Sequence, residues 1–232
     1  MFTRNVADEN SKMTKKDRNG ILYALFWQMS LVFVEIFKKL KVTPNQVTIL
    51  GFLFYLSAGL CFWQGSYGVN ILGAIFFNLG LVMDCTDGKL ARATGKTSSV
   101  GIWLDYNFDY IKYLFIYLPM AMAIFRDTQD PKVFIFGFII ITTILTYIII
   151  TQRFGEFPFA KEETEGISRS LIHILAKQFY AYEMVEAVLL LVFAFLNDLS
   201  LFMVVWAVYF ALFYLATAVF LGSKVARNDG RN

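Results

Sequence analysis

Four aspartates and their spacing are the strongest sign of chemistry in this sequence. Asp84 and Asp87 are three residues apart, and Asp105 and Asp109 are four apart, so each pair lies on one face of a helix. Apolar stretches on both sides of these acids are long enough to cross a bilayer. Carboxylates are costly beside hydrocarbon, and four that lie close together repel one another unless they bind protons or cations. The cluster therefore predicts a cation site.

The ligands that this cluster offers are all oxygen atoms, which favours Mg²⁺ or Mn²⁺ over zinc. Four bridging carboxylates suit two ions about 3.5–4 Å apart, a geometry that enzymes use for displacement at phosphorus. The two cysteines, Cys61 and Cys85, are expected near opposite ends of adjacent helices, so they predict neither a disulfide nor a zinc site.

Residues beside the aspartates fit a phosphate-bearing substrate. Gly88 removes a side chain where a ligand approaches, and Ala91 keeps the next helical turn small. Arg92 can fork onto phosphate oxygens, and Gly101 opens the next helix near Asp105. Transfer of a phosphoryl group needs cations to neutralise charge and a base to accept the proton of the attacking hydroxyl.

The composition indicates an all-α integral membrane protein. The chain has 232 residues, of which 57% are hydrophobic, with 25 Phe and 12 Tyr, whereas soluble domains average about 45–50% apolar residues. Six segments reach the length that a spanning helix needs. They are Gln46–Trp63, Gly68–Asp84 with a continuation into the aspartate motif, Gly101–Phe125, Lys132–Thr151, Phe179–Leu196 and Leu199–Leu221.

A further apolar segment, Asn19–Leu40, precedes the six spans. Its polar residues favour an amphipathic helix that lies in the membrane interface rather than a span. Thr43 and Pro44 are typical of the N-cap and first turn of the helix that follows. We therefore expect three parts: a cytoplasmic N-terminus with the interfacial helix (residues 1–41), a six-helix catalytic domain (42–223) and a cytoplasmic tail (224–232).

The distribution of positive charge predicts the orientation. Residues 1–45, 85–100, 152–178 and 222–232 together hold 18 of the 21 Lys and Arg residues, and cytoplasmic segments carry this excess. Both termini and the aspartates are thus expected on the cytoplasmic side, of the plasma membrane if the cell is prokaryotic. The N-terminal Lys and Arg residues are expected to meet anionic lipid rather than nucleic acid.

The aspartates form part of a longer pattern, D-x2-D-G-x2-A-R-x8-G-x3-D-x3-D. It resembles the signature of the CDP-alcohol phosphotransferase family, without departures. Eight fixed positions over 26 residues make this signal specific. They are filled by Asp84, Asp87, Gly88, Ala91, Arg92, Gly101, Asp105 and Asp109.

This resemblance implies a reaction and a set of roles. Such enzymes cleave the pyrophosphate of a CDP-linked donor, transfer the phosphoryl-bearing part to an alcohol and release CMP. Asp84, Asp87, Asp105 and Asp109 would bind two Mg²⁺ or Mn²⁺ ions, and Asp109 would also be the base. The nucleotide would meet Pro44, Asn45, Asp87, Gly88, Ala91, Arg92 and Gly101. Family members are usually homodimers whose cleft opens to the cytosol and the inner leaflet.

Several alternatives remain open at this stage. We expect a CDP-diacylglycerol or ether-lipid donor, a polar alcohol acceptor and a phosphatidyl-alcohol product; the second possibility is CDP-choline or CDP-ethanolamine with diacylglycerol as acceptor. Lys112 and Arg153 hint at an anionic acceptor, although Lys112 also suits a structural role beside the acids. Acids within six spans also occur in cation transporters, but Arg92 argues against a cation pathway. Retention of all four aspartates argues against a non-catalytic scaffold.

Overall fold

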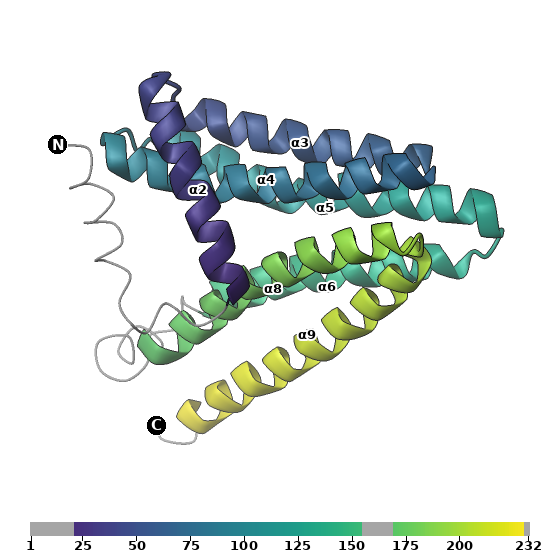
Figure 1. Cartoon of the computed structure of the whole chain (residues 1–232). Helices are drawn as coiled ribbons and strands as arrows, with labels where there is room; N and C mark the ends of the chain where they lie inside the picture. The colour runs from purple at the N-terminus through teal and green to yellow at the C-terminus, as the bar shows by residue number, and fades with distance from the viewer. Residues whose placement is uncertain (1–20, 155–168, 230–232) are drawn as a thin grey trace.

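The described chain is helical throughout, and one steep helix crosses one end of a bundle of longer helices (Figure 1). The computed structural model describes residues 21–154 and 169–229, and no strand occurs within them. The helices are α2 (Ile21–Lys39), α3 (Pro44–Gln64), α4 (Tyr67–Thr94), α5 (Ser99–Thr128), α6 (Lys132–Phe154), α8 (Arg169–Phe195) and α9 (Leu199–Asp229). Within the described residues, α3, α4, α5, α6 and α9 contain stretches long and apolar enough to cross a membrane. The predicted all-α fold is thereby confirmed, and these five apolar helices support an integral membrane protein, while the six spans and the interfacial helix stay predictions.

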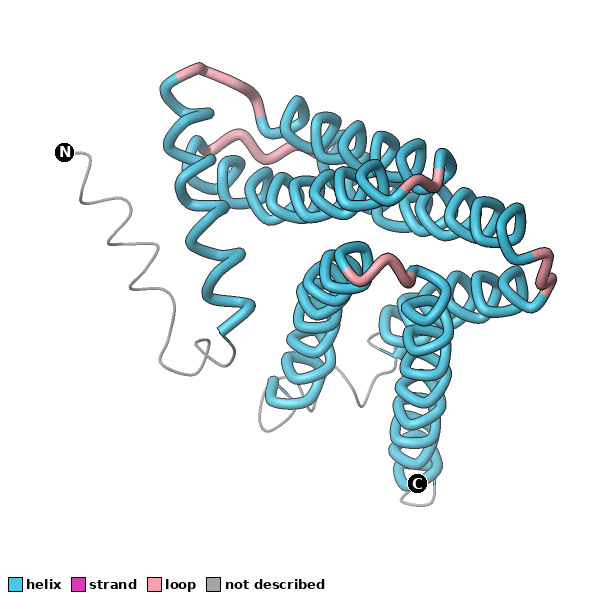
Figure 2. Tube along the Cα trace, turned by 45° about the vertical axis from the view of Figure 1, so that its right-hand side comes forward, coloured by secondary structure: helices cyan, strands magenta, loops and turns pink. Residues whose placement is uncertain are grey.

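The bundle has two halves. In one half α3 packs against both α4 and α5, and in the other α9 packs against α6 and α8. The halves meet where α4 contacts α8 and α5 contacts α6, while α2 crosses α4 and α8 steeply (Figure 1). Short connections join α3 to α4, α5 to α6 and α8 to α9 at one end of the bundle, and the α4–α5 loop lies at the other (Figure 2).

Local signals in the sequence set the ends of the helices that carry the site. Thr43 caps α3 as predicted: its hydroxyl accepts a hydrogen bond from the Gln46 backbone N–H, and the Gln46 side chain accepts one from the Thr43 N–H. Gly95 ends α4 in the left-handed conformation, with φ 66°. Helix α4 thus continues ten residues past Asp84, so Asp84 and Asp87 lie within the helix rather than at its very end.

Glycines bring α3, α4 and α5 into close contact. A Cβ on Gly59 of α3 would lie 2.0 Å from the carbonyl oxygen of Phe115 on α5, so these backbones touch where only hydrogen fits. A Cβ on Gly80 of α4 would lie 2.9 Å from the Tyr55 ring of α3. Because Asp84 lies one turn beyond Gly80, this close packing also fixes the position of the first aspartate against α3.

Candidate active site

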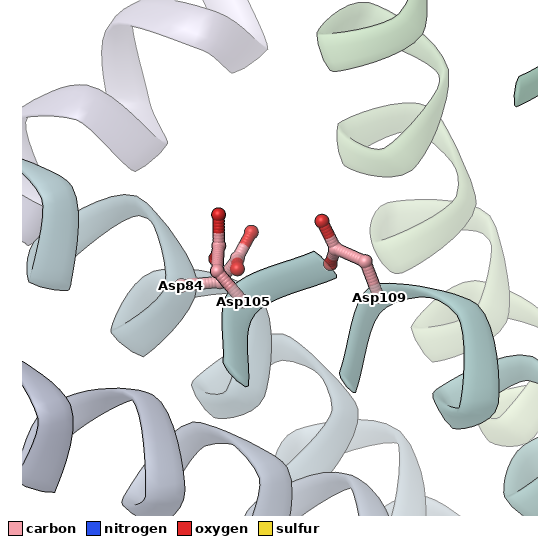
Figure 3. A group of neighbouring side chains, drawn as sticks. All are labelled: Asp84, Asp105 and Asp109. Carbon is pink, nitrogen blue, oxygen red and sulfur yellow. The ribbon is translucent and has the colours of Figure 1, made fainter. Parts of the chain in front are cut away.

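Three aspartate carboxylates from two helices lie near one another (Figure 3), beside the part of α5 that follows the α4–α5 loop. Asp84 comes from α4, and Asp105 and Asp109 come from α5. One carboxylate oxygen of each lies within 4.8 Å of the others. In the described part of the chain, no hydrogen bond or salt bridge reaches the carboxylate of Asp84 or Asp105. Three carboxylates gathered so closely, two of them without donors, suit a hard divalent cation.

The fourth aspartate, Asp87, stands beside these three in a different environment. Thr48 of α3 donates a hydrogen bond of 2.5 Å from its hydroxyl to Asp87 Oδ2, and Asp87 is only 7% exposed. All four aspartates nevertheless line one cavity of about 340 Å³, here called the aspartate cavity. Its other walls include Tyr23 and Trp27 of α2, Lys89 and Arg92 of α4, and Glu183 of α8.

A second cavity of about 230 Å³ lies under the α4–α5 loop and is here called the loop cavity. All seven residues that the family resemblance assigns to the nucleotide line it, and Thr48, Lys96, Thr97 and Ser98 join them. Asp87, Gly88, Arg92 and Asp105 line both cavities. One extended ligand can therefore reach from the loop cavity to the aspartates.

The two motif glycines serve these cavities in different ways. A Cβ on Gly88 would meet only the Arg92 guanidinium, at 3.4 Å, so this position leaves the cavity wall open. A Cβ on Gly101 would lie 2.6 Å from Asn45 Oδ1. Gly101 therefore makes room first for the Asn45 side chain, which itself lines the loop cavity.

The structure adds Glu183 of α8 to the site and shows a second buried glutamate, Glu186, on the same helix; the sequence reasoning missed both. Glu183 lines the aspartate cavity, and its Oε1 lies 2.9 Å from Lys112 Nζ. Glu186, three residues later, is fully buried and accepts a hydrogen bond from the Tyr117 hydroxyl. Both lie in a segment predicted to span the membrane. Acids inside an apolar span are themselves a functional signal, and it could have revealed them.

Helix α2 is a second missed contributor. The Lys89 ammonium of α4 is buried, donates a hydrogen bond of 2.5 Å to Ser30 Oγ of α2 and lies 3.9 Å from the centroid of the Trp27 ring. Trp27 and Tyr23 also line the aspartate cavity. The crossing helix is thus attached to the motif helix and forms part of the site.

The two residues suggested for the acceptor lie in contrasting places. Lys112 is 2% exposed and forms salt bridges with Asp109 at 2.8 Å and with Glu183 at 2.9 Å. Arg153 is exposed near the end of α6 and is not among the residues that line the two cavities. A role for either residue in acceptor binding stays a prediction.

Comparison with known proteins agrees with the motif. Archaetidylinositol phosphate synthase of Pyrococcus horikoshii is 41% identical over 84 residues, which are 36% of this chain and 43% of that protein. A bifunctional IPC transferase and DIPP synthase of Aquifex aeolicus is 29% identical over 60% of this chain and 30% of its own length. Phosphatidylinositol phosphate synthase of Streptomyces avermitilis is 30% identical over 40% of this chain and 37% of its own.

The chain spans less than half the length of each of these relatives. The family model described as CDP-alcohol phosphatidyltransferase, in contrast, matches residues 41–219, which include every helix from α3 to α8 and most of α9. The chain therefore belongs to the CDP-alcohol phosphatidyltransferase family.

Proposed function

We propose that this protein transfers a phosphatidyl-type group from a CDP-linked lipid to a polar alcohol and releases CMP. The observation that carries the proposal is the group formed by Asp84, Asp105 and Asp109, whose oxygens lie within 4.8 Å of one another beside a cavity lined by the predicted nucleotide residues. The names of the relatives favour a phosphorylated inositol as the acceptor. The donor is then the lipid, rather than CDP-choline or CDP-ethanolamine.

The four aspartates are proposed to hold two Mg²⁺ or Mn²⁺ ions, for which an all-carboxylate set is well suited. Bound ions would neutralise the diphosphate of the donor and stabilise the departing CMP. Arg92 lines both cavities and can form paired hydrogen bonds with phosphate oxygens. The cytidine would lie in the loop cavity, against Pro44, Asn45, Ala91 and Gly101.

Asp109 is proposed to be the base. An acceptor hydroxyl in the aspartate cavity would attack the lipid-linked phosphorus, form a new O–P bond and break the bond to the CMP oxygen. The hydroxyl proton would pass to the carboxylate of Asp109, which lines the same cavity. Arg153 stays a proposed contact of an anionic acceptor, on its positive charge alone. Lys112 is proposed to act on the acceptor only through Asp109, because its charge is already paired with Asp109 and Glu183.

The proposed membrane arrangement has six spans, with α8 as the sixth, and α2 in the cytoplasmic interface. The steep crossing of α2 over α4 and α8 supports the interfacial placement (Figure 1). The bundle end with the α4–α5 loop would face the cytoplasm, in agreement with the distribution of Lys and Arg. Of the predicted cytoplasmic N-terminal part (1–41) and tail (224–232), residues 1–20 and 230–232 lie outside the described residues, while residues 224–229 continue α9. We also propose a homodimer, on the family resemblance.

The test is transfer itself. The purified chain is supplied in detergent micelles with CDP-diacylglycerol or CDP-archaeol, inositol phosphate and Mn²⁺, and radiolabelled CMP and lipid product are measured. We expect CMP and a phosphorylated lipid product in equal amounts, and no turnover after addition of a chelator. Absence of CMP release with every donor and with inositol phosphate, glycerol phosphate, serine and inositol as acceptors would refute the proposal. Release with CDP-choline and diacylglycerol alone would assign the alternative donor.

A further inference from the structure

A buried lysine connects the three neighbouring aspartates, Asp84, Asp105 and Asp109, here called the aspartate group, to a neighbouring helix. Lys112 lies one turn beyond Asp109 on α5, and its Nζ is 2.8 Å from Asp109 Oδ1 and 2.9 Å from Glu183 Oε1 of α8. The pale ribbon of α8 runs beside Asp109 in Figure 3. One ammonium group thus pairs with two carboxylates, Asp109 of the aspartate group and Glu183 of α8, and both carboxylates line the same cavity.

The surroundings hold this ammonium group in place. Its Nζ lies 5.2 Å from the ring centroid of Tyr55 on α3 and 5.3 Å from that of Tyr113 on α5. Both rings contribute cation–π attraction at these distances. Lys112 itself is 2% exposed, so water has little access to its charge. A lysine enclosed in this way has one geometry rather than many.

Glu183 is fixed just as firmly. Its Oε1 also accepts a hydrogen bond of 2.8 Å from the Tyr113 hydroxyl, which lies 2.9 Å from the Tyr182 hydroxyl. Glu183 as a whole is 4% exposed. Asp109 is thereby linked through Lys112 to an anchor on α8, and this chain of contacts crosses between the two halves of the bundle.

The shared cation has an electrostatic consequence for Asp109. If Lys112 faced Asp109 alone, it would neutralise this carboxylate and weaken its attraction for a divalent ion. Because Glu183 takes part of the same positive charge, Lys112 can orient Asp109 by Oδ1 while the Asp109–Lys112–Glu183 group keeps a net negative charge. The second oxygen of Asp109 remains for a cation or for a hydroxyl proton.

We propose that Lys112 and Glu183 are positioning residues, which fix the orientation of Asp109 and set the net charge of the aspartate group. This inference rests on the proposed function, because it assigns the pair to the site where the donor and the cations would bind. Neither residue belongs to the aspartate motif, and each acts on the site through its neighbour.

The proposal predicts opposite effects of two substitutions on cation affinity. Glu183→Gln removes one negative charge and leaves Lys112 to neutralise Asp109, so Mn²⁺ should bind more weakly, by about tenfold or more. Lys112→Met removes the positive charge, so Mn²⁺ should bind at least as tightly as in the wild type. Asp109 then loses its orientation, however, so kcat should fall by about tenfold or more while KM for the donor changes little.

The experiment measures Mn²⁺ binding without donor, by electron paramagnetic resonance of the free ion and by titration calorimetry, on the full chain in micelles. Glu183→Gln, Lys112→Met and the double variant are compared with Glu186→Gln. This control changes a buried glutamate on the same helix that does not line the aspartate cavity. We expect Glu186→Gln to match the wild type and the double variant to bind Mn²⁺ more tightly than Glu183→Gln.

The outcomes separate this inference from its alternatives. Equal Mn²⁺ affinity in Glu183→Gln and Glu186→Gln would overturn it, as would weaker binding in Lys112→Met. If Lys112→Met does not fold, the double variant decides, because it leaves no unpaired buried charge from this pair. A double variant that binds Mn²⁺ no more tightly than Glu183→Gln overturns the proposal. The variants could show the expected differences in Mn²⁺ affinity while the wild type releases no CMP. That result would refute the transferase function but support the proposed effect of Lys112 and Glu183 on the charge of the aspartate group.

Discussion

Two sets of carboxylates lie inside the helical bundle of this protein, and they differ in whether they have hydrogen-bond donors. Asp84 and Asp105 face a cavity and receive no hydrogen bond or salt bridge from the described residues. Glu183 and Glu186 on α8 are 4% and 0% exposed, and each has a donor: Lys112 and Tyr113 for the first, Tyr117 for the second. The first set lacks the hydrogen-bond donors that the second set has.

The difference agrees with the proposal that the aspartates are kept for a ligand. A buried carboxylate with donors is part of the packing, and its removal costs stability. Carboxylates that crowd together without donors repel one another, so the fold alone gives no reason to keep them. Neutralising the aspartates should therefore cost activity more than stability, while changes at Glu186, which does not line the aspartate cavity, should cost stability more than activity.

The largest effect is expected from Asp105→Asn. This change keeps the shape of the side chain but removes one negative charge from the aspartate group, so CMP release should fall by about a hundredfold or more. Removal of a residue that only hydrogen-bonds to a metal ligand already lowers metal affinity or activity by about 10- to 100-fold. Thermal unfolding without added metal should stay at or above the wild-type midpoint, because repulsion is relieved. An active Asp105→Asn variant, or one with a clearly lower midpoint, would contradict the comparison.

Metal addition should produce the next largest change. A ligand that binds only the folded state at 100 times its dissociation constant stabilises that state by about 2.7 kcal/mol. Mn²⁺ should therefore raise the thermal midpoint of the wild type by several degrees, and a chelator should reverse the increase. Fluorescence-monitored unfolding measures this shift. Asp105→Asn should lose most of it, whereas Glu186→Gln should keep it; an equal shift in both variants would place the ion elsewhere.

The aspartate group could be predicted from sequence because both pairs follow helical spacing within one short motif. Asp84, Asp87, Asp105 and Asp109 all line one cavity, and the predicted nucleotide residues all line its neighbour. The helical membrane fold followed from the long apolar stretches, and the start of α3 from Thr43 and Pro44.

The α8 glutamates and the cavity wall on α2 could not be placed from sequence in the same way. Glu183 lies 71 residues from the lysine it pairs with, and no local period relates the two. Trp27 reaches the site only because α2 turns back across α4. Such contacts depend on how helices cross, which the pattern of apolar residues along each helix does not specify. Acids within an apolar span signal a partner but do not identify it.

Thr48→Val tests the aspartate that lies between the two sets. Asp87 lines both cavities, yet it has a donor in the Thr48 hydroxyl. Loss of this hydrogen bond should lower kcat/KM by about tenfold, because the Thr48 hydroxyl orients Asp87, which is a proposed ligand of the metal ions. Thr86→Val is the matched control, since Thr86 is buried on the helix of Asp87 but donates only to the Val82 carbonyl. Equal activities in the two variants would show that Thr48 is ordinary packing.

The smallest effect, and the one most specific to the α8 glutamates, is expected from Tyr117→Phe. Tyr117 and Glu186 are both fully buried, and the phenol hydroxyl is a hydrogen-bond donor to the glutamate. Its removal should lower the free energy of unfolding by about 1 kcal/mol, since hydrogen bonds between membrane helices contribute little individually. Thermal unfolding measures the loss, and CMP release should remain within about twofold of wild type. A large loss of activity with unchanged stability would move Glu186 from the packing of the bundle into the site.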